Sequence, residues 1–252
     1  MPVASRTEED IYAALGMAWI APELREDHGE IDAAIAGTLP ALVRVEDLRG
    51  DLHTHSDWTD GRDSLGDMVR RARDKGYAYV AVTDHSVGLG MTNGLNLERI
   101  AARNKEIAKL NAELAPFRVL TGTELEIRAD GRLDYPDDVL SGFEVVTASI
   151  HSAFNQPRAQ ITQRLIGAMQ HPLVTAISHP TGRLLERRDP YDVDLDAVIE
   201  AAVATGTRLE VNGGPERLDL PDWAVRKAME RGATIVIDSD AHAVEELSLI
   251  HI

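Results

Sequence analysis

The 252-residue sequence contains no cysteine. Disulfide bonds and thiolate ligands are therefore excluded, and only nitrogen and oxygen atoms could hold a metal ion. The sequence also lacks any apolar run of about 18 residues, so no membrane-spanning helix is expected. Its N-terminus lacks the basic and then apolar segments of a secretory signal. A cytoplasmic location fits these absences.

Positive charge is scarce, because 26 Lys and Arg residues face 42 Asp and Glu residues, giving a net charge of −16. This balance argues against binding of nucleic acid over a broad, positively charged surface. It does not exclude nucleic acid, since a carboxylate-lined metal site contributes acidic charge that bound cations offset. The length fits one large α/β domain or two small ones.

From Gly50 onward, short β-branched runs alternate with amphipathic stretches. Gly76 and Gly232 follow two of these stretches, as glycines do at helix C-termini. Strands that alternate with helices predict βαβ units and a parallel sheet. Strands are expected at 48–53, 78–83, 118–123, 144–150, 174–178, 207–211 and 234–237, and helices at 64–75, 97–113, 158–170, 195–205 and 221–231.

Seven strands in this rhythm favour a closed barrel over a doubly wound sheet. No G-x-G-x-x-G motif follows the first strand, as a dinucleotide-binding doubly wound fold would require. Polar motifs instead follow nearly every strand, and in a barrel all those strand ends meet at one rim. We therefore expect an α/β fold with a barrel of the TIM-like kind.

The two ends of the chain differ from this pattern. Residues 1–46 are expected to form a connector or docking arm with short helices at 7–15 and 29–37 and an extended piece at 18–22. Thr7 would cap the first helix, with Asp10 three residues later. Residues 47–252 would form the main domain. Only ten residues follow His242, which leaves little room for a helix over the last strand, so we expect an altered or truncated C-terminus.

The first chemical motif contains His53 and His55, two residues apart at a predicted strand end. Both side chains then project from the same side of the strand, where two imidazoles form a ready pair of metal ligands. Asp60 follows in a turn that could fold back over the same spot. The alternative interpretation is a pair of exposed rim histidines.

Similar motifs follow the later strands. Any one of them is more commonly a structural histidine or a helix-capping acid. Together they favour one convergent site, because six of the nine histidines fall at predicted strand ends. The other three, His28, His171 and His251, are expected to be solvated surface residues. The further motif residues are His85, Glu124, His151, His179, Asp240 and His242.

These motifs resemble those of the PHP (polymerase and histidinol phosphatase) superfamily across residues 47–243. The resemblance implies a distorted seven-stranded (β/α)7 barrel and three metals. The first metal would be held by His53, His55, Glu124 and Asp240, the second by Asp60, His85 and His242, and the third by His151, His179 and the bridging Glu124. Glu124, Asp240 and His151 are the expected catalytic residues.

A narrower resemblance concerns the leader. Residues 8–16 and 19–25 are similar to the connector that joins the polymerase thumb to a C-terminal PHP domain in bacterial family X DNA polymerases. Residues 151–155 and 179–185 are also similar to that subgroup. The chain would then be the PHP part without its polymerase, and a polymerase domain is a possible partner that this sequence does not contain.

Mixed imidazole and carboxylate ligands suit Mn²⁺, Zn²⁺ or Fe²⁺ better than Mg²⁺. Such ions lower the pKa of bound water to about 7, supplying a hydroxide nucleophile, and neutralise phosphate oxygens. Asp84, next to His85, is expected to be a hydrogen-bonding partner rather than a ligand.

Five polar residues just past strand ends are candidates for binding the substrate. An arginine fork binds phosphate through two hydrogen bonds, and Arg183 is the favoured one, with Arg187 and Arg188 adding charge to the same loop. The alternative is a surface arginine paired with one of the many acids. The five candidates are Arg183, Asn155, Arg158, Asn212 and Arg217.

The leading hypothesis is a metal-dependent 3′–5′ exonuclease or 3′-end phosphodiesterase that acts on DNA in repair. The alternatives are a small-molecule phosphatase of the histidinol-phosphatase type, which the acidic charge favours somewhat, and a non-catalytic scaffold, which the complete ligand set disfavours. The sequence leaves the metal, the polarity of digestion and the oligomeric state open.

Overall fold

The computed structural model describes residues 6–247. The chain divides between Arg44 and Val45 into two compact units. The first unit contains α1 (Glu8–Ala14), the 3-10 helix η1 (Pro22–Leu24) and α2 (Glu30–Ala36). Both predicted helices are therefore present, whereas η1 was not predicted.

Polar contacts hold much of the first unit together. Thr7 caps α1 as predicted, since its hydroxyl accepts a hydrogen bond of 3.2 Å from the Asp10 amide. The Arg25 guanidinium donates two hydrogen bonds of 2.8 Å to Glu8. Because its large apolar residues are mostly exposed, with Ile20 an exception, packing alone contributes little to this unit.

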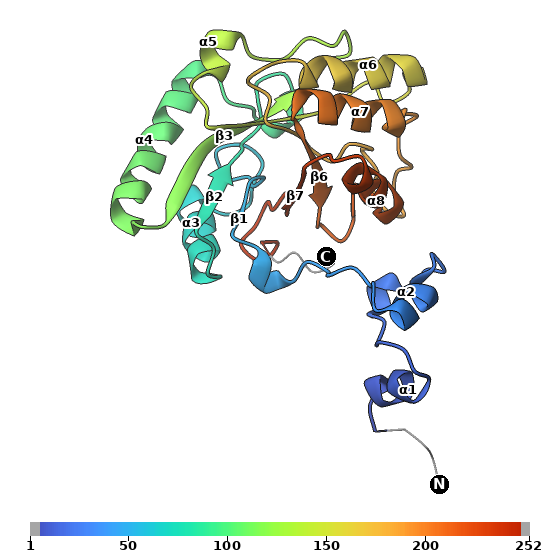
Figure 1. Cartoon of the computed structure of the whole chain (residues 1–252). Helices are drawn as coiled ribbons and strands as arrows, with labels where there is room; N and C mark the ends of the chain where they lie inside the picture. Colours follow the sequence, from blue (N-terminus) through green and yellow to red (C-terminus); the bar gives the residue numbers. More distant parts are fainter. Residues whose placement is uncertain (1–5, 248–252) are drawn as a thin grey trace. The chain divides into compact units, whose positions relative to one another are not determined.

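The second unit is built on seven parallel strands whose order in the sheet is their order in the chain (Figure 1). The segments just past β1 and β7 meet: Thr54 bridges Ala241, and the His55 amide donates to the Ala241 carbonyl at 2.9 Å. The result is a nearly closed (β/α)7 barrel, which confirms the predicted fold class. The strands are β1 (Gly50–Asp51), β2 (Tyr79–Val82), β3 (Arg118–Glu126), β4 (Val145–Ser149), β5 (Ala176–Ile177), β6 (Arg208–Asn212) and β7 (Ile235–Asp238).

Helices connect the strands, and three of them, α3, α4 and α7, begin at side-chain caps that the sequence supplies. Ser64, Asn96 and Asp194 each accept a hydrogen bond from the backbone amide three residues later. The four-residue α5 and the 3-10 helices η2 and η3 were not predicted. These elements are η2 (Val45–Asp47), α3 (Leu65–Asp74), η3 (Gly90–Thr92), α4 (Leu97–Leu114), α5 (Asp137–Leu140), α6 (Arg158–Met169), α7 (Leu195–Thr205) and α8 (Asp222–Glu230).

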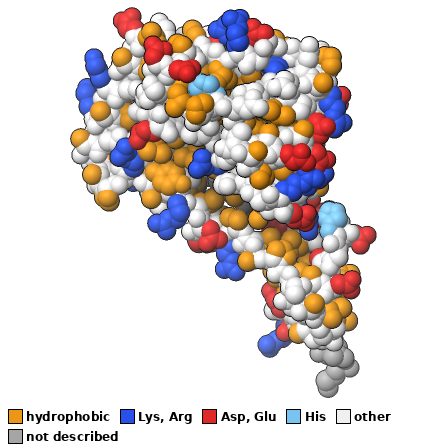
Figure 2. All heavy atoms as spheres, turned by 45° about the horizontal axis from the view of Figure 1, so that its top comes forward, with side chains coloured by type: hydrophobic (Ala, Val, Ile, Leu, Met, Phe, Trp, Pro, Cys, Tyr) orange, Lys and Arg blue, Asp and Glu red, His pale blue; other side chains and the backbone are white. Residues whose placement is uncertain are grey.

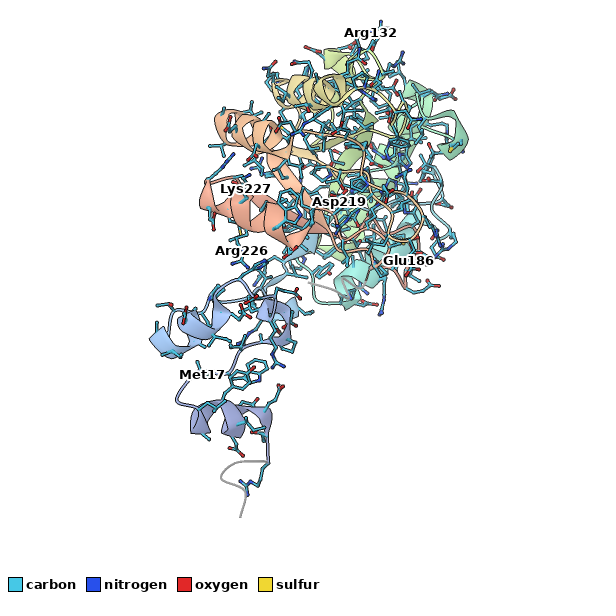
Figure 3. The ribbon with its side chains drawn as sticks, turned by 90° about the vertical axis from the view of Figure 1, so that its right-hand side faces the viewer. Met17, Arg132, Glu186, Asp219, Arg226 and Lys227 are labelled. Atoms are coloured by element: carbon cyan, nitrogen blue, oxygen red, sulfur yellow. The ribbon has the colours of Figure 1, made fainter. Side chains whose placement is uncertain are left out.

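Two apolar clusters fix the helices against the barrel. One packs α3 and α4 against β2 and β3, and the other packs α6, α7 and α8 against β3 to β6. On the outside, Lys227 of α8, labelled in Figure 3, pairs with Asp196 of α7 at 2.5 Å. Charges of both signs are interspersed with apolar side chains over the face in Figure 2. The clusters leave the carboxyl ends of the strands free for polar side chains.

After β7 the chain turns back toward the barrel. Leu247 is fully buried in the cluster beside α3, and Val244 packs against the same cluster. Residues 248–252, including His251, lie outside the described part of the chain, so the expected alteration of the C-terminus stays a prediction. Among the described residues, no helix is long and apolar enough to cross a membrane.

The core on the α6 side yields a first prediction. Leu165 of α6 is 0% exposed, and we expect Leu165→Ala to lower the free energy of unfolding by about 2–5 kcal/mol, because burial is lost and a cavity is left. Urea unfolding followed by circular dichroism measures the change. The matched control is Leu97→Ala on α4, where the side chain is 64% exposed. Equal effects of the two substitutions would contradict this assignment of the core.

Candidate metal centre

Two imidazoles lie at the barrel rim just after β1. His53 and His55 are both fully buried, with ring centroids 5.1 Å apart. The His55 ring also stacks on His242 at 4.2 Å and on His85 at 4.5 Å. Histidines from three separate segments therefore share one buried space, and the interpretation of exposed rim histidines does not hold for the first pair.

The carboxylate of Glu124 lies at the centre of this space. Glu124 belongs to β3 and is 1% exposed. Its two oxygens lie within 3.5 Å of a ring nitrogen from five different histidines. These nitrogens are His179 Nε2 at 2.9 Å, His85 Nδ1 at 3.1 Å, His151 Nε2 at 3.2 Å, His53 Nε2 at 3.4 Å and His55 Nε2 at 3.5 Å.

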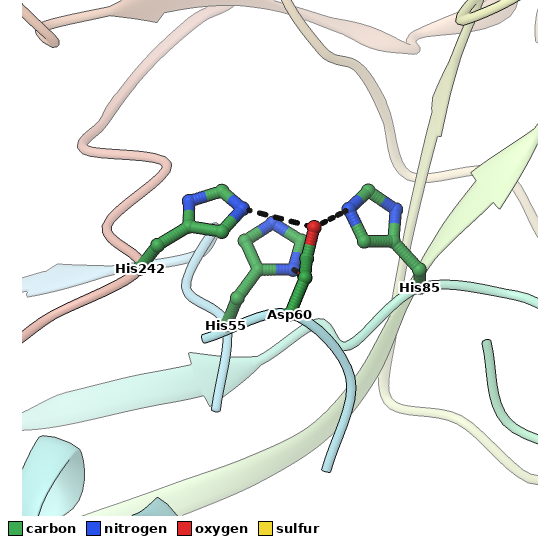
Figure 4. Close-up of side chains that lie close together, drawn as sticks. All are labelled: His55, Asp60, His85 and His242. Atoms are coloured by element: carbon green, nitrogen blue, oxygen red, sulfur yellow. Dashed lines mark ion pairs between the residues drawn. The ribbon is translucent and has the colours of Figure 1, made fainter. Parts of the chain in front are cut away.

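Asp60 organises a second part of the site (Figure 4). Its Oδ2 atom lies 3.3 Å from His85 Nε2 and 3.6 Å from His242 Nε2. His55 Nδ1 lies 3.9 Å from Asp60 Oδ1. These four residues can offer ligand atoms within 4.8 Å of one another, a spacing that suits one metal ion.

Two further groups meet the same spacing. One contains His53, His55, Glu124 and Asp240, and the other contains His85, Glu124 and His151. The first is the group that the family resemblance implies. The second has His85 where the resemblance implies His179, which instead contacts the same Glu124 oxygen as His151. All nine expected ligands are thus brought together, and their assignment to particular metals stays a prediction.

The chemistry of these residues fits divalent cations. His53 Nε2, His179 Nδ1 and both ring nitrogens of His55 are buried without a hydrogen-bond partner. Unsatisfied buried polar atoms cost free energy, which bound cations would offset at His53 and His55, two members of the groups with metal-ligand spacing. The set of imidazole nitrogens and carboxylate oxygens suits Mn²⁺, Zn²⁺ or Fe²⁺.

Electrostatics favour ionised acids at this site. Burial acts to raise the pKa of Glu124, but the charges of His151 and His53 outweigh it and hold that pKa well below its usual range. Burial, aided by the charges of His242 and His85, lowers the pKa of His55 to about 3. The Glu124 carboxylate and the His55 imidazole are thus in the forms that bind metals. At His242, burial acts to lower the pKa, but the contacts with Asp60 and Asp240 outweigh it and raise that pKa to about 9, so a metal bound there would displace a proton.

Two ligand candidates have unusual backbones. His179 has φ of 29° and Asp240 has φ of 54°, a left-handed region that non-glycine residues rarely occupy. Such conformations persist where surrounding contacts enforce them, and they concentrate at functional sites. Here Asp240 is fixed by two neighbours, Asn212 Nδ2 at 3.1 Å and Arg217 Nε at 3.0 Å.

Two buried glutamates orient the imidazoles, and the sequence did not single them out. Glu210 lies 2.6 Å from His53 Nδ1 and accepts a 2.6 Å hydrogen bond from the His179 amide. Glu126 lies 3.0 Å from His151 Nδ1. Strand alternation was an available signal, because Glu126 lies two residues after Glu124 and therefore faces the same side of β3.

The five substrate candidates lie in different surroundings. Asn212 and Arg217 contact Asp240, as described. The Arg183 guanidinium instead donates to the backbone carbonyls of Arg217, at 2.8 Å, and Leu218. Thus Arg183 joins two loops through backbone groups, and its binding of phosphate stays a prediction.

Arg158, at the start of α6, pairs with Asp194 at 3.2 Å, which matches the alternative of an arginine paired with an acid. Asn155 lines a hollow of about 1140 Å³ beside the β4–α6 loop. In that hollow, Arg188 lies over the Phe154 ring at 4.3 Å. A second hollow, of about 500 Å³, adjoins the metal centre itself. Its lining includes Asp60, Asp240, His242, Arg62, Arg187, Asn212 and Arg217.

Comparison with known protein families identifies the family of this chain. The family model described as PHP domain matches residues 51–208. The chain belongs to the PHP domain family. A second model, described as DNA polymerase beta thumb, matches residues 1–26, which agrees with the family X likeness of the leader.

Two relatives are informative. The chain is 46% identical over 241 residues to the DNA polymerase/3′-5′ exonuclease PolX of Bacillus subtilis, an alignment that covers 96% of this chain and 42% of that protein. It therefore spans less than half of that relative. It is 28% identical over 210 residues to the protein named "Probable phosphatase TTE1963" of Caldanaerobacter subterraneus, covering 77% of each.

Solved structures share the fold. The hisK protein of Listeria monocytogenes superposes with a TM-score of 0.64 at 13% identity, covering 79% of this chain and 97% of that one. A histidinol phosphate phosphatase of Lactococcus lactis, complexed with zinc, L-histidinol and phosphate, superposes with a TM-score of 0.55 at 18% identity, covering 78% and 87%.

The orienting role of Glu210 can be tested directly. We expect Glu210→Gln to weaken divalent-metal binding by about 10- to 100-fold, because loss of a partner that orients a ligand typically has that effect. Titration of stripped protein with Zn²⁺ measures the affinity. The exposed Glu200→Gln on α7 is the matched control, and equal affinity in the two variants would refute the role.

Proposed function

We propose that this chain is a metal-dependent phosphoesterase that acts as a 3′–5′ exonuclease or 3′-end phosphodiesterase on DNA, in repair. The observation that carries this proposal is the 46% identity to a DNA polymerase/3′-5′ exonuclease over 96% of the chain. The thumb match at residues 1–26 supports a polymerase as the functional partner. A cytoplasmic location agrees with a DNA substrate in a bacterial cell.

The site residues have distinct parts in this proposal. The nine clustered side chains would hold up to three divalent ions, which supply an activated water and neutralise phosphate charge when bound. Glu124 would join the ion groups, since it contacts five of the histidines. Asn212 and Arg217 keep the Asp240 carboxylate in place. His151 is half-buried, and its Nε2 lies 3.2 Å from Glu124, so it would hold a metal ion together with that carboxylate.

Two hollows have linings that suit a nucleotide chain. In the larger one, the Arg188 guanidinium lies 4.3 Å from the centre of the Phe154 ring, which also stacks on the ring of Tyr191 at 6.2 Å. Aromatic and guanidinium planes stack with nucleobases of any sequence. The smaller hollow adjoins Asp60 and has Arg187 in its lining. Arg187 pairs there with Glu216 at 2.9 Å, so it would have to exchange this partner to bind a phosphate.

A small-molecule phosphatase is the second candidate. The specific observation in its favour is the 28% identity to "Probable phosphatase TTE1963" over 77% of both chains. The same metal chemistry would serve a phosphomonoester such as histidinol phosphate. The net charge of −16 also suits a small substrate that needs no long electrostatic track.

One assay separates the two candidates. We expect Mn²⁺-loaded protein to shorten 5′-labelled single-stranded DNA from its 3′ end, giving a ladder on a gel. His151→Ala should lower that rate by at least about 100-fold, since loss of a ligand exceeds the typical cost of losing its partner. Exposed His28→Ala is the control. Release of phosphate from a monoester without any DNA shortening would favour the phosphatase and overturn the exonuclease.

Metal content tests the ligand assignment independently. We expect Asp240→Ala to lower the bound metal by at least one ion per chain, because Asp240 contacts His53 and His55 at 3.4 and 3.1 Å within one group. Elemental analysis after dialysis against Zn²⁺ measures the ratio. The exposed Asp222→Ala on α8 is the control. Unchanged stoichiometry in Asp240→Ala would break the assignment.

A further inference from the structure

A charged residue lies fully buried behind the metal centre. Arg103, on α4, is 0% exposed. Its guanidinium donates to the Gly122 carbonyl at 2.7 Å and to Asp84 Oδ2 at 3.1 Å. A buried guanidinium is costly unless it is paired and hydrogen-bonded. Arg103 is therefore a specific partner of Asp84, which is also 0% exposed.

Asp84 uses its remaining hydrogen-bonding capacity on the loop after β1. Its Oδ1 accepts from the Ser56 amide at 2.8 Å, from the Ser56 hydroxyl at 3.0 Å and from the Thr59 hydroxyl at 3.1 Å. One carboxylate thus fixes both ends of the segment 56–59. The next residue along the chain is Asp60.

Asp60 depends on this loop more than the other acids of the centre depend on theirs. Its side chain is 29% exposed, against 8% for Asp240 and 1% for Glu124. Glu124 is held within a strand, whereas Asp60 lies in a turn. The Thr59 hydroxyl lies 3.2 Å from Asp60 Oδ1 and 3.1 Å from Asp84 Oδ1, so the two carboxylates share its single proton.

We propose that Arg103 and Asp84 are positioning residues that, through Ser56 and Thr59, hold the Asp60 carboxylate toward His55, His85 and His242. This inference rests on the proposed metal binding. The group of His53, His55, Glu124 and Asp240 contains no residue of the segment 56–60, and its His55 is held separately by the hydrogen bond from its amide to the Ala241 carbonyl at 2.9 Å. Loss of the hydrogen bonds from Arg103 through Asp84 to Thr59 should therefore weaken the class of metal site that contains Asp60 and spare the other. A residue that served only folding would not discriminate between sites.

We call the hydrogen bonds from Arg103 through Asp84, Ser56 and Thr59 to Asp60 the relay. Thr59→Val tests it with the least disturbance, because valine keeps the shape of threonine and removes only the hydroxyl. Thr162→Val in α6 is the matched control: Thr162 and Thr59 are 7% and 9% exposed, and each loses a hydrogen bond. Both full-length variants are stripped and titrated with Mn²⁺ in a calorimeter, and their melting temperatures are measured without metal.

We expect Thr59→Val to weaken one class of Mn²⁺ site by about 10- to 100-fold, the usual effect of removing an outer partner, with the other class unchanged. Its melting temperature should match that of Thr162→Val. Arg103→Met should weaken the same class, even where it also lowers the melting temperature. Wild-type affinities in Thr59→Val, or equal weakening of all sites, would overturn the relay. Absence of Mn²⁺ binding by the wild type would instead overturn the proposed function.

Discussion

The contact between Glu124 and five imidazoles is the constraint on which the rest of the centre depends. A buried carboxylate is costly, and here five histidines from four separate segments of the chain lie against it. They can meet only if the strands end at one level. The backbone enforces that level, since the Glu124 amide donates to the Thr83 carbonyl at 2.7 Å, and its carbonyl accepts from the Ser86 amide at 3.0 Å. The register of the barrel strands therefore determines the geometry of the site.

A second ring of buried acids keeps the imidazoles oriented. Glu210, Glu126 and Asp84 lie behind the centre, and each makes two or more hydrogen bonds to residues that carry or adjoin a ligand candidate. These acids concentrate negative charge inside the barrel. Divalent cations would offset that charge, so the same residues that make the fold costly without metal make it receptive to metal.

Much of the fold followed from local signals in the sequence. Residues 195–205 were predicted with the bounds that α7 has, and the structure shows what sets them: Asp194 caps the helix and Gly206, with φ of 75°, ends it. Strands β1 and β5 were predicted too long, since only two residues of each make ladder pairs. A run of apolar residues in the sequence indicates that a segment is buried. The length of the strand depends on where it separates from its twisted neighbouring strands, which is a tertiary property.

The clustering of the ligand candidates was predictable, because parallel strands bring their carboxyl ends to one rim. Their partners were harder to predict. Glu210 is flanked by Leu209 and Val211, so its charge gives no local sign that it contacts His53, which follows β1. Arg183 shows the same limit: its guanidinium meets carbonyls of a segment 34 and 35 residues away. Contacts between loops so distant depend on how the whole barrel closes.

The charge that a substrate meets at the centre is set by a few nearby residues and not by the net charge of −16. The smaller hollow is lined by three arginines and five acids, and two of those acids are the ligand candidates Asp60 and Asp240. Beyond about 8–10 Å, surface charges are largely screened at physiological salt. A phosphate at the rim would therefore respond mainly to these groups and to any bound cations that offset the acids, and only weakly to acids on the outer helices. The acidic composition thus weighs little against a nucleic acid whose end alone enters the site, and much more against one bound along its length.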